Sequence, residues 1–257
     1  MADRMNLDGA AALVTGGGGG LGAATARALA ARGAKVTVLD VNEEQSTAVA
    51  SEIGGLALFC DVTSSDSATG ALAHAREAHG PARVLINCAG VAPAKRILGR
   101  EGPMDLEDFR QVIDINLIGT FNLTRLAAAD MADLEPDDEG QRGVIISTAS
   151  VAAFEGQIGQ AAYAASKGGV HALTIVAARE FARSGIRVCT IAPGLFGTPM
   201  LLGMPQEVQD SLAAQVPFPS RFGTPEEYAR LALSICDNPM LNGETIRLDG
   251  AIRMGPR

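Results

Sequence analysis

The chain has 257 residues, of which 47% are hydrophobic and only 19% charged, and its formal net charge is −8. This composition supplies a large aliphatic core and excludes an intrinsically disordered chain. The acidic balance argues against nucleic acid as a partner, because phosphate backbones demand clustered Lys and Arg.

No linker or internal repeat divides the chain, so we expect one domain over residues 1–257. No apolar run reaches the roughly 20 residues that a membrane-spanning helix needs. The first predicted strand begins near Ala10, which leaves no room for a secretory signal. The four scattered cysteines have no metal-like spacing and indicate reduced thiols. We therefore expect a soluble intracellular protein that binds neither a metal nor a membrane.

Short apolar runs alternate with helix-like stretches along the chain. The predicted strands are 11–15, 35–40, 56–61, 83–87, 143–148, 187–192 and 244–249. The predicted helices are 21–32, 43–53, 66–79, 105–132, 162–184 and 225–236. Nearly continuous apolar strands are typical of sheets covered on both faces. The alternation predicts an α/β fold with a doubly wound parallel sheet, which binds ligands at the carboxyl ends of its strands.

Two segments interrupt this alternation. Residues 133–142 are acidic and rich in turn formers, and we expect a solvated surface loop there. Residues 194–220 combine several Pro and Gly with the apolar run LLGM directly after a predicted strand. A long irregular segment in that place is typical of an active-site lid. The alternative for residues 194–220 is a surface helix with its packing loops.

A glycine-rich turn joins the first strand to the first helix. Glycines there let the backbone approach a pyrophosphate, whose charge the helix N-terminus stabilises. Asp40 ends the next strand, where a carboxylate accepts hydrogen bonds from adenosine ribose hydroxyls and repels a 2′-phosphate. The pattern therefore predicts NAD rather than NADP. The candidate cofactor-binding residues of the turn are Gly16, Gly19, Gly20, Leu21 and Gly22.

Further cofactor candidates follow the third and fourth strands. Asp61 and Val62 are positioned to receive the adenine, although Asp61 alternatively caps the helix that starts near Ser65. The run after the fourth strand offers small residues as a floor for the cofactor. Its members are Asn87, Cys88, Ala89 and Gly90.

Tyr163 and Lys167 stand four residues apart, and Ser150 lies thirteen residues upstream of Tyr163. Residues at this spacing share one helix face. A nearby ammonium lowers a phenol pKa, which is ordinarily about 10. We therefore expect Tyr163 to exchange a proton with a substrate hydroxyl while Ser150 holds the same oxygen. Asn116, polar among apolar neighbours, either satisfies local backbone or holds a water that links Lys167 to solvent.

These motifs, with Pro193-Gly194, resemble the short-chain dehydrogenase/reductase family over about residues 8–254. The resemblance implies an NAD(P)-dependent oxidoreductase with a seven-stranded Rossmann sheet, usually a tetramer. Longer runs such as IAPGLFGTPML and NGETIRLDGAIRM are similar to the type II 3-hydroxyacyl-CoA dehydrogenases. Mitochondrial members of that group are also called 17β-hydroxysteroid dehydrogenase type 10. This finer resemblance implies NAD-linked oxidation of short or branched 3-hydroxyacyl-CoA esters to 3-oxoacyl-CoA.

The resemblance also implies residue roles. Tyr163 acts as acid and base, Ser150 holds the substrate oxygen, and Lys167 stabilises the phenolate and binds the nicotinamide ribose. Gln157 is a candidate hydrogen-bond partner of the substrate, or alternatively a solvated loop residue. The residues expected around the nicotinamide carboxamide are Pro193, Gly194, Phe196 and Thr198. Lys95, Arg96 and Arg100 are the candidates for meeting the CoA phosphates.

The sequence departs from the commoner family pattern at two positions. Cys88 replaces the second Asn of N-N-A-G, and Ala251 replaces the last Gly of D-G-G, as in the type II group. Two alternative functions stay open: an NAD-linked steroid or secondary-alcohol dehydrogenase, and a cofactor-binding scaffold subunit of a multiprotein complex. The Ala-rich composition suggests a bacterial cytoplasmic protein, with the mitochondrial matrix as the alternative location.

Overall fold

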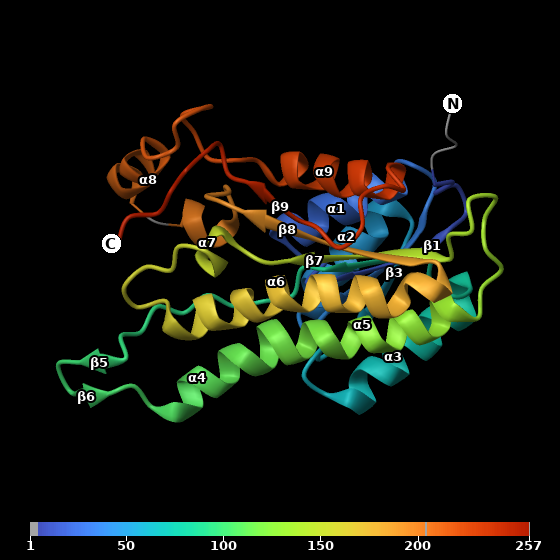
Figure 1. The fold of residues 1–257 in the computed structure, drawn as a ribbon, viewed down its shortest axis with the longest axis horizontal. Helices are drawn as coiled ribbons and strands as arrows, with labels where there is room; N and C mark the ends of the chain where they lie inside the picture. The colour runs from blue at the N-terminus through green and yellow to red at the C-terminus, as the bar shows by residue number, and fades with distance from the viewer. Residues whose placement is uncertain (1–4, 204, 257) are drawn as a thin grey trace.

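A seven-stranded parallel sheet forms the centre of the protein, whose computed structural model describes residues 5–203 and 205–256 (Figure 1). The strand order is β3-β2-β1-β4-β7-β8-β9. The strands are β1 Ala11–Thr15, β2 Lys35–Asp40, β3 Leu56–Phe59, β4 Val84–Asn87, β7 Gly143–Thr148, β8 Ile186–Pro193 and β9 Thr245–Leu248. The order reverses direction between β1 and β4, and a doubly wound sheet binds its ligand at that point. The predicted fold, a Rossmann-type α/β sheet, is confirmed.

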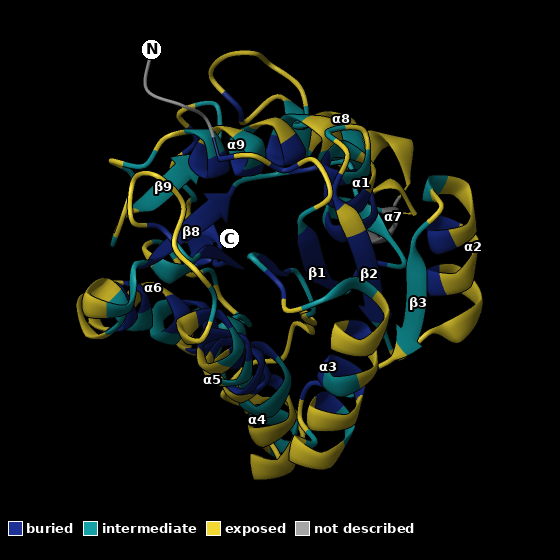
Figure 2. Ribbon diagram, turned by 90° about the vertical axis from the view of Figure 1, so that its right-hand side faces the viewer, coloured by how far each residue is buried: buried dark blue, intermediate teal, exposed yellow. Residues whose placement is uncertain are grey.

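Helices cover both faces of the sheet. On one face lie α1 Gly20–Ala30, α2 Glu43–Ile53 and α9 Pro225–Asp237; on the other lie α3 Ser65–His79, α5 Gly119–Ala132 and α6 Ala161–Phe181 (Figure 1). Successive β1 side chains enter opposite cores: Ala12 and Val14 join the α1–α9 core, whereas Ala11 and Leu13 join the α3–α5 core. The central strands are buried on both faces, and the helices expose only their outer surfaces (Figure 2).

The predicted helix over 105–132 contains an irregularity. It consists of α4 Leu106–Ile113, a π-helical turn η1 Asp114–Ile118, and α5. Single π turns inside helices concentrate at functional sites, and this one carries the buried Asn116. The predicted helix over 162–184 likewise ends in a 3₁₀ turn, η3 Ala182–Ser184, after α6.

Some elements were not predicted. A small hairpin, β5 Leu98–Gly99 with β6 Gly102–Pro103, projects from the end of the molecule where α4 begins (Figure 1). A 3₁₀ turn, η2 Val151–Ala153, follows Ser150. The segment 194–220 contains two short helices, α7 Pro199–Leu202 and α8 Gln206–Ala213, which agrees with the alternative of a surface helix with its packing loops. A role of this segment as a lid stays a prediction. Residues 133–142 contain neither helix nor strand, as predicted. Within the described ranges, no helix is long and apolar enough to cross a bilayer.

A buried arginine ties β8 to the C-terminal helix. Arg187 is only 5% exposed, and no described residue gives it an ion pair. Its guanidinium donates instead to Gln141 Oε1 at 2.7 Å and to the carbonyls of Ile235 at 2.8 Å and Cys236 at 3.0 Å. A further bond reaches the carbonyl of Leu241 at 2.8 Å. The side chain therefore donates to four acceptors at once, in three buried hydrogen bonds and one partly buried one.

We expect Arg187→Met to lower the free energy of unfolding by about 3 kcal/mol, because several buried oxygens lose their donor. The matched control is Arg32→Met, which removes the partly exposed Arg32–Asp237 ion pair. That control is expected to cost no more than about 1 kcal/mol. Urea unfolding of the three proteins measures both values. Equal losses in the two variants would show that the buried bonds are not what makes Arg187 important.

Candidate active site

The first turns of α6 bring Tyr163 and Lys167 to the carboxyl end of β7. The Lys167 ammonium lies 5.8 Å from the centroid of the Tyr163 ring. It is 4% exposed and donates a 2.7 Å hydrogen bond to the carbonyl oxygen of Thr148, the last residue of β7. Ser150 follows two residues later, and its hydroxyl hydrogen-bonds to the Tyr163 phenol. The structure thus brings together the three residues that the spacing predicts.

The pKa of Tyr163 is raised in this structure, whereas the spacing predicts that it is lowered. Loss of hydration raises the pKa of Tyr163, and the hydrogen bond from Ser150 opposes this only in part. The ammonium lies near the ring and bonds to the Thr148 carbonyl, so hydration loss dominates the phenol. Burial also lowers the pKa of Lys167 to about 8. At neutral pH the site therefore contains a protonated phenol beside an ammonium.

Asn116, in the π turn, joins helix and loop behind Lys167. Its Oδ1 accepts from Val91 N at 2.8 Å, and its Nδ2 donates to Val91 O at 2.9 Å and Ser166 Oγ at 3.0 Å. These bonds agree with the alternative that Asn116 satisfies local backbone. A Cβ added to Gly90 would lie 3.0 Å from Asn116 Oδ1 and 3.5 Å from Lys167 Nζ. Gly90 therefore leaves space where the two polar groups converge. A water held by Asn116 that links Lys167 to solvent stays a prediction.

The glycine turn after β1 is closely packed and needs its glycines. Gly16 has φ +60°, and a Cβ there would lie 2.8 Å from Ala89 N. A Cβ on Gly22 would lie 2.2 Å from Gly16 O. The turn continues through Gly19 and Gly20 into Leu21, and no described side chain caps the start of α1. The amides at this helix N-terminus are therefore suited to an anion such as a pyrophosphate.

Asp40 lies over the same turn. Its Oδ2 accepts from Gly18 N at 2.9 Å and its Oδ1 from Asn42 N at 3.0 Å. These backbone bonds fix the carboxylate at the end of β2, beside the start of α1. The predicted position of an adenosine-ribose acceptor is thus occupied by a fixed, partly exposed carboxylate.

A residue missed in the sequence supports the segment after β4. Thr15 Oγ1 accepts from both Cys88 N at 3.1 Å and Ala89 N at 3.2 Å. Thr15 stands directly before the glycines of the turn. That position was the feature of the sequence that could have identified it as a site residue. Asn87 donates to Thr124 and Ser147, each at 3.3 Å, and its buried Oδ1 has no partner among the described residues.

Asp61 and Val62 follow β3 as predicted. Asp61 Oδ1 accepts from the Thr63 amide at 2.9 Å and hydroxyl at 2.7 Å. Ser64 caps α3 by accepting from Ser67 N, so the alternative that Asp61 caps this helix is wrong. Val62 is buried, and a Cβ added to Gly119 would lie 2.5 Å from its Cγ2. Contact of Asp61 and Val62 with an adenine stays a prediction.

The segment after β8 is anchored to the sheet edge. Pro193 ends β8, and Gly194 N donates to Leu248 O at 3.0 Å. The ring of Phe196 is buried against Gly223, where a Cβ would lie 2.7 Å from the ring. The Thr198 carbonyl accepts from the amides of the first turn of α7. A role for these residues around a carboxamide stays a prediction.

Gln157 bonds to the C-terminal segment, a partner that was predicted neither by its substrate role nor by the alternative of a solvated loop residue. Its Nε2 donates to Gly255 O at 3.2 Å, and Ile158 N donates to Pro256 O at 3.0 Å. The C-terminal segment therefore lies along the loop that follows Ser150. A direct contact between Gln157 and a substrate stays a prediction.

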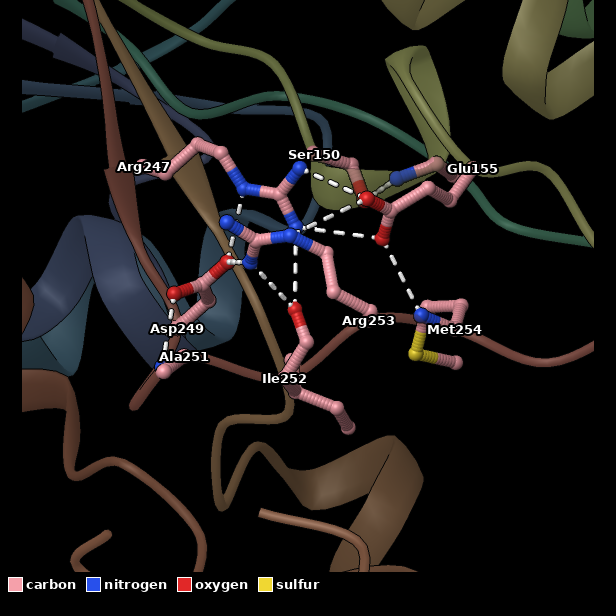
Figure 3. Close-up of polar contacts among 9 residues, drawn as sticks. Ser150, Glu155, Arg247, Asp249, Ala251, Ile252, Arg253 and Met254 are labelled. Atoms are coloured by element: carbon pink, nitrogen blue, oxygen red, sulfur yellow. Dashed lines mark hydrogen bonds and ion pairs between the residues drawn. The ribbon is translucent and has the colours of Figure 1, made fainter. Parts of the chain in front are cut away.

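An ion-pair network fixes this arrangement (Figure 3). Glu155 accepts two hydrogen bonds from Arg247, at 2.9 and 3.1 Å, and a third from Met254 N at 3.0 Å. Arg247 also pairs with Asp249 at 2.7 Å, and Arg253 approaches both carboxylates. The guanidinium of Arg247 holds the pKa of Glu155 below its usual value. The network thus links β9 and the C-terminal segment to the loop that carries Ser150.

Comparisons with known proteins show the family to which the chain belongs. The model of the short chain dehydrogenase family matches residues 10–208. The 3-hydroxyacyl-CoA dehydrogenase type-2 of Bos taurus is 54% identical over 255 residues, and that of Homo sapiens 53%; both alignments cover 98% of each chain. A crystal structure of 3-hydroxyacyl-CoA dehydrogenase type-2 from Mycobacterium avium superposes with a TM-score of 0.90, at 46% identity, over 97% of this chain and 98% of that one. The chain belongs to the short-chain dehydrogenase family.

Proposed function

We propose that the protein interconverts short or branched (S)-3-hydroxyacyl-CoA and 3-oxoacyl-CoA with NAD as the cofactor. The observation that carries the proposal is the convergence of Ser150, Tyr163 and Lys167 at the sheet edge that also bears Asp40. The substrate class rests on the similarity to 3-hydroxyacyl-CoA dehydrogenases type-2 over nearly the whole chain.

The residues present fit NAD. Asp40 offers carboxylate oxygens to the adenosine ribose, and the glycine turn contains no Lys or Arg for a 2′-phosphate. An ammonium has three N–H donors, and the described residues supply one acceptor to Lys167, at Thr148. Its remaining donors are suited to the hydroxyls of the nicotinamide ribose. When bound, the nicotinamide supplies the hydride chemistry.

The side chains perform the proton transfer. In the reductive direction Tyr163 donates its proton to the oxygen of the ketone, and Ser150 donates a hydrogen bond to the same oxygen. The Lys167 ammonium stabilises the phenolate that remains. In the oxidative direction the phenolate of Tyr163 removes the hydroxyl proton. Because the pKa of Tyr163 is raised, neutral pH favours its role as the acid.

The reductive reaction is expected to weaken as the pH rises through about 8. The pKa of Lys167 is lowered to about 8 by burial, so the side chain is a cation below this pH and neutral above it. The neutral amine no longer stabilises the phenolate. A pH profile of kcat/KM for acetoacetyl-CoA reduction measures this decrease, which we call the alkaline limb. Lys167→Arg stays charged and should lack the alkaline limb. A flat wild-type profile from pH 7 to 9 would contradict the assignment.

Two arginines near the β5–β6 hairpin are suited to the CoA phosphates. Lys95 forms an ion pair with Asp108, so its expected role is weakened. Arg96 and Arg100 are exposed, and the described residues give them no ion pair. We expect the Arg96→Ala/Arg100→Ala variant to raise the KM for acetoacetyl-CoA about tenfold, through two lost exposed charge contacts. Steady-state kinetics should show an unchanged KM for NADH.

The matched control is Arg110→Ala, an exposed arginine on α4 that pairs with Glu107. This variant should retain the wild-type KM for acetoacetyl-CoA. An unchanged KM in the Arg96/Arg100 variant would remove both residues from the site.

A second candidate is an NAD-linked steroid or secondary-alcohol dehydrogenase. The apolar side chains of the predicted lid favour it, because Leu202, Val208 and Phe218 are exposed and suit a sterol as well as an acyl chain. Comparing kcat/KM for acetoacetyl-CoA with that for a 17β-hydroxysteroid separates the two functions. A higher value for the steroid would replace the acyl-CoA proposal.

We also propose a homotetramer, on the family resemblance and on one surface feature. The side chains of Ile118 in η1, Phe121 in α5, and Leu173 and Val176 in α6 line an apolar groove of about 410 Å³. A second copy of the chain would cover this face. The expected cytoplasmic location, with the mitochondrial matrix as alternative, stays a prediction.

A further inference from the structure

A buried polar cluster lies behind Lys167 and includes a residue to which the mechanism gives no role. Tyr228, on α9, is fully buried. Its hydroxyl lies 2.7 Å from Thr148 Oγ1 and 3.7 Å from Cys88 Sγ. The cluster thus joins a helix of one face of the sheet to the ends of β4 and β7.

The direction of each hydrogen bond in this cluster follows by elimination. Thr148 Oγ1 lies 2.6 Å from the carbonyl oxygen of Asn87, which can only accept, so the single hydroxyl proton of Thr148 goes there. The phenol of Tyr228 must then donate to Thr148 Oγ1. Burial raises the pKa of Tyr228 well above its ordinary value, so the donor proton is retained. The thiol of Cys88 completes the chain by donating to the phenol oxygen.

Thr148 connects this cluster to the candidate active site. Its side chain receives the phenol proton of Tyr228, while its main-chain carbonyl accepts the Lys167 ammonium at 2.7 Å. Ser150 follows two residues later on the same strand end. A displacement of Thr148 would therefore move the acceptor of Lys167 and the backbone that leads to Ser150.

We propose that Tyr228 is a positioning residue that holds Thr148 so that the Thr148 carbonyl fixes the Lys167 ammonium beside Tyr163. The proposal rests on the proposed function, since it assigns work to Lys167. It also explains the departure at Cys88: a thiol side chain at this position bonds with the Tyr228 hydroxyl behind the strand ends. Tyr228 is fully buried, and its polar contacts are with Thr148 and, more weakly, with Cys88, so any effect on the site passes through these two residues.

The test is Tyr228→Phe, which keeps the ring and removes the hydroxyl. We expect kcat for acetoacetyl-CoA reduction to fall about tenfold, the effect of one buried hydrogen bond. The alkaline limb of the pH profile should move to lower pH, because the ammonium loses part of its fixed acceptor. Fluorescence titration should show weaker NADH binding for the same reason.

The other titratable groups that face Lys167 do not contribute to the alkaline limb of the pH profile. They are the Tyr163 phenol and the Cys88 thiol, and burial raises the pKa of both. Only Lys167 therefore changes charge near pH 8 among these groups.

A matched control separates positioning from stability. Thr174 and Thr190 share a buried 2.6 Å hydroxyl bond between α6 and β8, away from Lys167. Thr174→Val should lower the unfolding temperature about as much as Tyr228→Phe, with no shift of the alkaline limb. Thr148→Val should shift the alkaline limb to the same pH as Tyr228→Phe does. The double variant Thr148→Val/Tyr228→Phe should shift the limb no further. Thr148→Ser, which keeps the hydroxyl, should restore the wild-type limb.

The proposal is overturned if Tyr228→Phe retains the wild-type limb and NADH affinity and loses only stability, as Thr174→Val does. Failure of the proposed function looks different, since wild-type protein would then not reduce acetoacetyl-CoA. In that case the pH dependence of NADH affinity would still report the protonation of Lys167. The variants would then be compared by this pH dependence instead of by turnover.

Discussion

Tyr163→Phe is expected to lower kcat for acetoacetyl-CoA reduction at least about 100-fold, the lower end of what a general acid contributes. The variant keeps the aromatic ring, 5.8 Å from the Lys167 ammonium, and loses only the proton that the ketone oxygen receives. Ser150 remains as a hydrogen-bond donor to the substrate, and it cannot replace the acid. The loss should therefore fall on kcat, with the fold and the cofactor site retained.

Two readings accompany this measurement. NADH affinity by fluorescence titration and the unfolding temperature should both stay near wild type, which shows that the chemistry alone has been removed. The loss should also exceed the tenfold loss expected for Tyr228→Phe, the other tyrosine of the chain. Near wild-type turnover in Tyr163→Phe would remove Tyr163 from the mechanism.

The second large effect concerns cofactor choice. Asp40→Asn is expected to lower the ratio of kcat/KM with NADH to that with NADPH about 100-fold. Like charges placed together cost several kcal/mol, and about 2.7 kcal/mol corresponds to a factor of 100. Asn keeps the size of Asp40 and an oxygen for Gly18 N, which now bonds to the carboxylate at 2.9 Å. The change should therefore appear mainly as a gain with NADPH.

Glu43→Gln is the matched control for Asp40→Asn, because it removes an exposed carboxylate three residues further on, in the first turn of α2. The cofactor ratio of this control should stay near wild type. If Asp40→Asn left the ratio unchanged, the discrimination would have to come from another part of the cofactor site.

The sheet could be predicted because its strands are short, nearly continuous apolar runs separated by helical periods. The irregular elements could not. The π turn that carries Asn116 adds one residue to a helical turn, and such an insertion hardly alters the apolar period over 105–132. The β5–β6 hairpin has only two residues on each strand, none of them buried, so its sequence shows no alternation of apolar and polar residues.

The site was predictable wherever a residue directly follows a strand or shares one helix face, as Asp40, Ser150, Tyr163 and Lys167 do. Tyr228 was not, because it meets Thr148 across 80 positions of sequence and from a helix on the other face. The pKa of Tyr163 was predicted in the wrong direction. Spacing shows that an ammonium is near, whereas hydration loss and the choice of the Thr148 carbonyl as its partner depend on the folded surroundings.

The most direct test of the proposed function follows absorbance at the NADH band while acetoacetyl-CoA is reduced by wild-type protein, with NADPH in a parallel reaction. We expect rapid consumption of NADH and little consumption of NADPH, because Ser150, Tyr163 and Lys167 form the proposed dehydrogenase site and the carboxylate of Asp40 repels a 2′-phosphate. No turnover by protein that still binds NADH would contradict the acyl-CoA assignment, and equal rates with NADPH would contradict the role of Asp40.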